Sequence, residues 1–214
     1  MSRNKKTKWI IPSVCMLLTS AVGIYAYYTA KDEMKTTLIV ADEFLGDLVD
    51  EFVLLEHGIV DKNKDGFYEL TDEEVLKNDY IVYPGVDIPK DPFVRYENLM
   101  GDAYLFVEVV GESTTEFQWS LRDCWKSTHL TGKHNGDVYV YQGQSTDAIE
   151  LTPENNENFQ EYILKAIDNS PNGGIVISDN FKVQETADLQ FYSYLIQSRR
   201  FNNYEEAFAA VSGS

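Results

Sequence analysis

Residues 189–197 read LQFYSYLIQ, and this stretch decides the fold class. Leu189, Phe191, Ser193 and Leu195 fall on one face of an extended chain, a period of two that is typical of a β-strand. The same alternation occurs in residues 103–109, AYLFVEV. Shorter stretches of strand-like composition are residues 93–96, 117–121, 138–141 and 175–177. Many strands without alternating long helices predict an all-β fold, an antiparallel β-sandwich.

Helices are expected in few places. Phe159, Ile163 and Ile167 lie at helical spacing, so a helix is predicted over residues 159–167. A terminal helix is predicted after Asn203, which can cap it, with two acids in the first turn where the helix dipole favours them. Residues 48–57 fit either a strand or a helix. We therefore expect one exported domain, residues 31–214, with a few short helices.

The composition describes a packed but very acidic protein. The chain has 214 residues, of which 43% are hydrophobic and 13% aromatic, and this is too core-forming for a disordered tail. Its 18 Lys and Arg residues face 35 Asp and Glu residues, a formal net charge of −17. Such a surface repels phosphate backbones, so no binding of DNA or RNA is expected.

The N-terminus, residues 1–30, is predicted to be an export signal. Four basic residues precede a charge-free apolar stretch, residues 9–30, which is about as long as a membrane helix. Cleavage near Ala26 by a signal peptidase is favoured over an uncleaved membrane anchor, because Pro12 and several small residues weaken a permanent span. In either case the remainder is expected outside the cytoplasm, extracellular or at the cell surface, with membrane contact only through this segment.

Removal of the signal would change both the charge and the cysteine content. After Ala26 there remain 14 basic and 35 acidic residues, a net charge of −21. Cys124 is then the only cysteine, so no intramolecular disulfide can form and the domain must rely on its core. We interpret Cys124, which precedes Trp125, as a small buried hydrophobic residue.

Residues 61–72, DKNKDGFYELTD, resemble an EF-hand calcium loop in ligand spacing. Gly66 occupies the sharp turn at position 6, whereas Tyr68 at position 8 and the short acid at position 12 depart from the pattern. The alternative is an acidic surface turn held by Gly66 and Asx-type hydrogen bonds. A structural calcium ion with a dissociation constant of about 10⁻⁴ to 10⁻³ M is expected. Its predicted ligands are Asp61, Asn63, Asp65, the Phe67 carbonyl, Glu69 and Asp72.

The sequence contains no convincing catalytic constellation. It has no His-Glu-x-x-His, no Gly-x-Ser-x-Gly and no phosphate-binding glycine loop. His129 and His134, in a predicted loop over residues 127–135, could share a metal with Asp123 or Asp137. Two solvent-exposed loop histidines are the favoured interpretation. We therefore predict that the protein is not an enzyme.

Three parts of the chain resemble one family. Residues 23–29, GIYAYYT, resemble the end of signal peptides that the dedicated SipW-type peptidase processes. Residues 83–94, YPGVDIPKDPFV, and 102–109, DAYLFVEV, are similar to a proline-glycine turn and the strand that follows it. Residues 189–208 resemble the closing strand and short helix. The family is the TasA and camelysin group of alternate-signal-mediated exported proteins of Gram-positive bacteria.

This resemblance implies a jelly-roll β-sandwich, secretion and, for the best-known members, assembly into biofilm matrix fibres. In those fibres an N-terminal segment of one subunit completes a sheet of the next, a form of β-augmentation. The matching segment here is residues 27–40, which includes the strand formers of residues 36–40. The alternative is that this strand pairs within its own domain. The resemblance is weakest over residues 41–78, so it implies nothing about calcium.

Two other functions are alternatives to a structural protein. Camelysin is described as a metallopeptidase, and the resemblance would bring that activity, but no metal-ligand motif can be matched here. A monomeric surface-binding module could use exposed aromatic residues, namely Trp119, Trp125, Tyr139 and Tyr141. Their alternating spacing instead predicts side chains of the core or of a sheet face.

Overall fold

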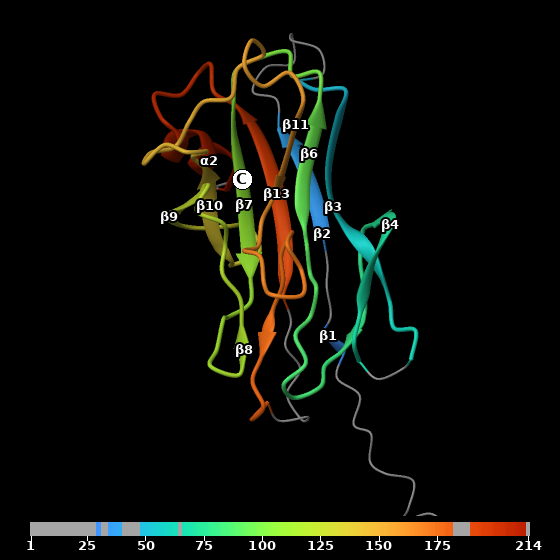
Figure 1. Cartoon of the computed structure of the whole chain (residues 1–214). Helices are drawn as coiled ribbons and strands as arrows, with labels where there is room; N and C mark the ends of the chain where they lie inside the picture. The colour runs from blue at the N-terminus through green and yellow to red at the C-terminus, as the bar shows by residue number, and fades with distance from the viewer. Residues whose placement is uncertain (1–28, 31–33, 40–47, 64–65, 182–188, 213–214) are drawn as a thin grey trace, which may run out of the picture.

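The computed structural model describes residues 29–30, 34–39, 48–63, 66–181 and 189–212, and they form a mostly β structure (Figure 1). The predicted all-β class is confirmed, whereas residues 1–28 of the predicted signal segment, residues 1–30, lie outside the described residues. The strands are β1 (Thr29–Ala30), β2 (Met34–Ile39), β3 (Glu51–Val60), β4 (Glu69–Val75), β5 (Tyr80–Ile81), β6 (Phe93–Glu97), β7 (Ala103–Val110), β8 (Phe117–Gln118), β9 (Trp125–Thr131), β10 (Asp137–Tyr141), β11 (Phe159–Tyr162), β12 (Val176–Ile177) and β13 (Gln190–Gln197). Helix α2 (Tyr204–Ser212) follows the last strand.

Two larger sheets contain most of these strands. Within the described residues, a five-stranded sheet has the order β2-β13-β7-β10-β9 and a four-stranded sheet has the order β11-β6-β3-β4. Two short pairs, β1-β5 and β12-β8, accompany them. Strand pairing in this part of the chain is antiparallel except between β2 and β13, which are parallel. Strand β2, at the edge of the five-stranded sheet, therefore differs from its other strands in having a parallel partner.

The main core lies between the two sheets, which pack face to face (Figure 1). Leu105 and Val107 of β7 and Phe191 of β13 share one buried cluster with Leu54 of β3 and Val94 of β6. Each of these side chains contributes about 1.5–3 kcal/mol when it leaves water. The alternating residues of 103–109 and 189–197 therefore meet this core as the sequence predicts.

Helix α2 covers the opposite face of the five-stranded sheet. Phe208 contacts Phe106 with ring centroids 5.0 Å apart and Tyr194 at 5.4 Å. This second cluster buries the other alternating positions of β7 and β13, so both strands are enclosed on both faces. The aromatic character of residues that would otherwise face solvent is explained by this helix.

The start of α2 confirms the predicted cap. The Asn203 side-chain oxygen accepts a hydrogen bond from the Glu206 backbone N–H at 2.8 Å. The Glu206 carboxylate in turn accepts one from the Asn202 N–H at 3.0 Å. The first bond satisfies a backbone donor that the first helical turn leaves without a partner, and the second holds the residue before the cap against the same turn.

The predicted helix over residues 159–167 is wrong. Residues 159–162 form β11, which pairs with β6 so that Phe159 lies opposite Tyr96. Their rings stack with centroids 5.1 Å apart. The local spacing of Phe159 and Ile163 fits a helix, but pairing with β6 buries the same residues and satisfies their backbone. Of the ambiguous residues 48–57, residues 51–57 belong to β3, again because a neighbouring strand is available.

Candidate functional site

The N-terminal edge of the five-stranded sheet is the first candidate site. β2 runs parallel to β13 in a continuous register from Met34 opposite Phe191 to Ile39 opposite Ile196. In Figure 1 it lies between β13 and β3, closing one side of the two sheets. Within a single chain this part of the predicted donor segment, residues 27–40, thus pairs with its own domain. The rest of that segment, other than Thr29 and Ala30 of β1, lies outside the described residues.

Strand β13 needs a neighbour at this edge. Seven of its eight residues are buried, with Phe191 and Leu195 in the core between the sheets. Its other edge is already paired along its whole length with β7. Without β2, the outward backbone groups of β13 would lack hydrogen-bond partners beside a hydrophobic core, which is costly for buried backbone.

The proposed calcium loop connects β3 to β4. Asp61 Oδ2 accepts a hydrogen bond at 2.9 Å from the N–H of Gly66, five residues later, and this bond closes the turn. Gly66 has φ of 85°, and a Cβ atom there would lie 2.1 Å from the Tyr83 ring. The glycine is therefore required by its backbone and by Tyr83 whether or not an ion binds. Asp65 lies outside the described residues.

The later predicted ligands lie on β4 or are exposed. Glu69 pairs with Val60 in the ladder and its carboxylate contacts the Lys62 ammonium at 2.5 Å. Asp72 lies three residues further along β4, about 10 Å away at the usual rise of a strand. Phe67 is 62% exposed. The loop thus presents Asp61, Asn63 and Glu69 near one hairpin end and Asp72 further from it.

Tyr68, the residue that departs from the EF-hand pattern at position 8, has a packing role. Its hydroxyl accepts a hydrogen bond from the Ile81 N–H at 2.6 Å and donates one to the Ile81 carbonyl at 3.3 Å. Its ring meets Tyr80 edge-on at 5.4 Å. Tyr68 thus connects the β3–β4 hairpin to β5 through hydrogen bonds and ring packing.

A buried carboxylate that the sequence reasoning missed lies under the β9–β10 hairpin. Glu108 of β7 is fully buried, and its Oε1 accepts hydrogen bonds from the N–H groups of His134 at 2.8 Å and Gly136 at 2.9 Å. Its Oε2 accepts one from the Tyr194 hydroxyl at 2.6 Å and lies 3.1 Å from His134 Nδ1. The His134 ring stacks on Tyr192 at 3.5 Å. One carboxylate therefore joins β7, β13 and the hairpin turn.

The turn is shaped for this carboxylate. A Cβ atom at Gly132 would lie 2.0 Å from the Glu108 carboxyl carbon, and one at Gly136 would lie 2.5 Å from the Val109 carbonyl oxygen. Asn135 between them has φ of 63°, in the left-handed region that asparagine tolerates. A single acid within the apolar run AYLFVEVV was the signal that could have revealed the cluster.

The Tyr194 hydroxyl should make the stability of the fold decrease at alkaline pH. Burial, followed by the hydrogen bond to Glu108 and its charge, raises the pKa of Tyr194 above its ordinary value near 10. The unfolded chain then releases this proton at lower pH than the folded protein, so the stabilisation is complete below about pH 10 and is lost as the pH rises further. In urea unfolding between pH 8 and 11.5, we expect the free energy of unfolding to fall above about pH 10. The fall should be shallower in Tyr194→Phe, and parallel curves would contradict this assignment.

A second buried charge cluster joins β3 to the segment before β6. The Lys90 ammonium contacts Glu56 Oε2 at 2.9 Å, with side-chain exposures of 3% and 0%. The next residues repeat the pairing, because the Asp91 carboxylate accepts hydrogen bonds from the His57 N–H at 3.1 Å and lies 2.7 Å from His57 Nδ1. Successive strand residues point to opposite faces, so the two pairs fix both sides of β3.

Other predicted site residues are dispersed. His129 is an exposed residue of β9, so the predicted loop over residues 127–135 is wrong for its first half. Asp123 instead pairs with Lys165 at 2.7 Å. Within the described ranges, no group of three or more His, Cys, Asp or Glu side chains could hold a metal ion.

Cys124 is half-buried against the core, and burial, followed by the charge of Glu161, raises the pKa of its thiol to about 12.

The aromatic residues considered for surface binding belong mainly to the core, as their alternation predicts. Trp125 is 5% exposed and its indole N–H donates to the Tyr162 carbonyl at 3.1 Å. Trp119, Tyr139 and Tyr141 are half-buried and pack against the main core. These four side chains therefore do not form an open aromatic platform.

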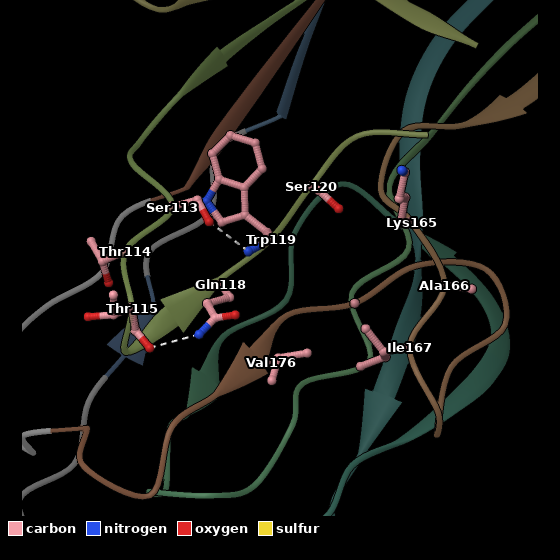
Figure 2. A pocket seen from close by; sticks show the side chains of 11 residues that line it. Ser113, Thr114, Thr115, Gln118, Trp119, Ser120, Lys165, Ala166, Ile167 and Val176 are labelled. Carbon is pink, nitrogen blue, oxygen red and sulfur yellow. Dashed lines mark hydrogen bonds between the residues drawn. The ribbon is translucent and has the colours of Figure 1, made fainter. Parts of the chain in front are cut away.

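An open pocket of about 640 Å³ lies between residues 113–120 and residues 165–176 (Figure 2). The first wall is the turn before β8 together with β8 itself, and the second includes β12 and the segment before it. In the turn, Ser113 Oγ accepts a hydrogen bond from the Trp119 N–H at 3.0 Å. The pocket is thus held by the short pair β8-β12 beside the main sheets.

Comparison with known proteins finds no matching family model, no matching curated protein and no matching solved structure. Among the described residues, no helix has both the length and the apolar character needed to cross a membrane.

Proposed function

We propose that this chain is an exported, non-enzymatic structural protein of the cell surface or biofilm matrix, built on a jelly-roll β-sandwich like the TasA and camelysin group. Its subunits assemble into fibres by exchange of the N-terminal strand β2. The observation that carries this proposal is the place of β2. It is the single parallel strand at one edge of the five-stranded sheet as described, next to a buried strand that requires a partner.

The pairing of β2 can be separated from the rest of the fold. β13, β7, β10 and β9 pair with one another without it, and the four-stranded sheet does not include it. A β2 strand from a second copy would make the same backbone hydrogen bonds to β13, so exchange conserves the contacts and costs little enthalpy. Leu48 and Val49 are buried in the main core, so residues 40–47 are the link that could extend, and eight residues reach about 26–29 Å.

Assembly is tested with the mature chain that begins at Tyr27. We expect size-exclusion chromatography and electron microscopy to show polymers whose formation is lost when residues 27–40 are deleted. A synthetic peptide of residues 29–40 should bind the deleted protein and restore its thermal stability, because it refills the β13 edge. A scrambled peptide of the same composition is the control. Mature protein that stays monomeric at high concentration, or polymers that persist in the deletion variant, would refute the proposal.

We also propose that the β3–β4 hairpin binds one calcium ion of structural role through Asp61 and its neighbours. The exposed carboxylates of Glu69 and Asp72, and the turn in which the Gly66 N–H donates to the Asp61 carboxylate, support this. At 10 mM calcium and a dissociation constant of about 10⁻⁴ to 10⁻³ M, binding stabilises the fold by about 1.4–2.7 kcal/mol. This corresponds to a rise in melting temperature of about 3–10 °C relative to excess chelator.

The calcium response should disappear in the double variant Asp61→Asn/Asp65→Asn, in which the side-chain oxygen at residue 61 can still accept the hydrogen bond from the Gly66 N–H. Asp168→Asn, a change of an exposed acid far along the chain, should leave the response unchanged. An identical melting temperature in calcium and chelator would show that the hairpin is only an acidic turn.

A further inference from the structure

The pocket in Figure 2 differs in chemistry from the acidic surface around it. Of the described residues that line it, none is Asp or Glu, although the chain has 35 of them. Its one cation is Lys165, whose ammonium already pairs with Asp123 at 2.7 Å. The described lining is therefore close to electrically neutral. It offers no unpaired charged group to which an ionic ligand could bind.

One wall presents neutral hydrogen-bonding groups held in place by the turn. Thr114 Oγ1 accepts from the Phe117 N–H at 3.1 Å, which leaves its hydroxyl hydrogen free to donate. The Gln118 side-chain N–H group donates to the Thr115 carbonyl at 2.8 Å, which orients the amide and leaves its oxygen as an acceptor. The exposed side chains of Thr115 and Ser120 add two more hydroxyl groups to the pocket lining. Polar groups that are already oriented lose little entropy on binding.

The other wall offers an apolar surface. Figure 2 shows Ile167 and Val176 facing the hydroxyl-bearing segment across the pocket. Val176 is 39% exposed, so an apolar ligand surface can reach it. Close packing fixes this wall, because a Cβ atom at Gly174 would lie 2.2 Å from Ile167 Cδ1. The volume falls within the range of about 300–1,000 Å³ that is usual for ligand pockets.

We propose that this pocket binds a neutral oligosaccharide. A sugar unit carries hydroxyl groups around its rim, which both donate and accept, and C–H groups on its faces, which pack on aliphatic side chains. The Thr114, Thr115, Gln118 and Ser120 groups match the rim, and Ile167 and Val176 match a face. The net charge of −17 disfavours acidic glycans, and the absence of a carboxylate from the described lining gives no preference for cationic ligands.

Isothermal titration calorimetry tests the proposal on the full chain in a detergent without a sugar headgroup. The probes are maltohexaose, cellohexaose and chitohexaose, with an anionic hyaluronan hexasaccharide as the chemical control. At least one neutral probe should bind with a dissociation constant of about 1 mM or tighter, and the anionic probe should not bind. The double variant Gln118→Ala/Ser120→Ala should weaken binding by about tenfold.

A matched control exists on another surface. Gln144 and Ser145 line a pocket of about 490 Å³ that also contains Asp123 and Glu161, so Gln144→Ala/Ser145→Ala removes the same groups elsewhere and should not change affinity. Val176→Glu, which places a charge against the bound sugar, should abolish binding while the melting temperature shows that the fold is kept. The proposal is overturned if no neutral probe binds at 5 mM, or if the Gln118/Ser120 and Val176 variants bind as tightly as the parent protein.

Discussion

Replacing Glu108 with alanine is expected to lower the free energy of unfolding by about 3–5 kcal/mol. The change removes the acceptor of the Tyr194 hydroxyl and of the His134 and Gly136 backbone N–H groups. These donors are enclosed between β7, β13 and the hairpin turn, so each one left without a partner costs about 1–3 kcal/mol. The missing side chain also leaves a cavity that the surrounding sheet cannot fill. Urea unfolding followed by circular dichroism measures the loss.

Two further variants separate this mechanism from a general effect of removing an acid. Glu108→Gln keeps an acceptor for the two backbone donors and should lose only about 1–2 kcal/mol. Glu112→Ala removes an exposed acid from the same region of the chain and should change stability by less than about 0.5 kcal/mol. If Glu108→Ala were as mild as Glu112→Ala, the cluster would not be the clamp that its hydrogen bonds indicate.

Replacing Lys90 with methionine should destabilise the protein by about 3–5 kcal/mol, the second large effect. The substitution keeps most of the volume but removes the ammonium group 2.9 Å from the buried Glu56 carboxylate. Lys90 Nζ also lies 5.6 and 5.7 Å from the ring centroids of Tyr80 and Phe191, so the substitution removes these cation–π contacts as well. Most of the cost should arise from Glu56, whose buried carboxylate loses the Lys90 ammonium in a region of low dielectric constant.

A double-mutant cycle tests this explanation. Glu56→Leu/Lys90→Met removes both charges and should recover most of the stability, because a buried ion pair is often no better than apolar residues of similar size. Lys62→Met, which breaks the exposed pair with Glu69, should cost no more than about 1 kcal/mol. A double variant as unstable as Lys90→Met alone would show that packing, rather than the uncompensated carboxylate, accounts for the loss.

Periodicity succeeded where one face of an element meets the core. Residues 103–109 and 189–197 alternate because every second side chain enters the space between the sheets, and this relation is local. The Asn203 cap is local too, since its partner is the N–H group three residues later. The helix predicted over residues 159–167 is wrong for the opposite reason. Its conformation depends on β6, more than sixty residues earlier in the chain, and spacing carries no information about that partner.

The candidate sites also divide into those that a local sequence pattern indicates and those that depend on residues distant in the chain. The spacing of acids and glycine in residues 61–72 could be read directly, as could the strand-forming residues near the N-terminus. The Glu108 cluster and the Lys90–Glu56 pair could not, because their partners are 26 to 86 and 34 residues away in the chain. The neutral pocket likewise arises from two segments about fifty residues apart. A lone acid in an apolar strand was the only hint of any of them.

By itself, the sequence determined the all-β class, the positions of β6, β7, β10 and β13, the terminal helix and the strong negative charge. These follow from periodicity, capping and composition, which act over a few residues or over the chain as a whole. Only the tertiary structure decided that β2 lies parallel to β13, that α2 encloses the outer face of the large sheet, and that Glu108 and Lys90 are buried with partners. Strand order and buried polar pairs depend on which distant segments share a core, and many alternative pairings satisfy the same local pattern until packing selects one.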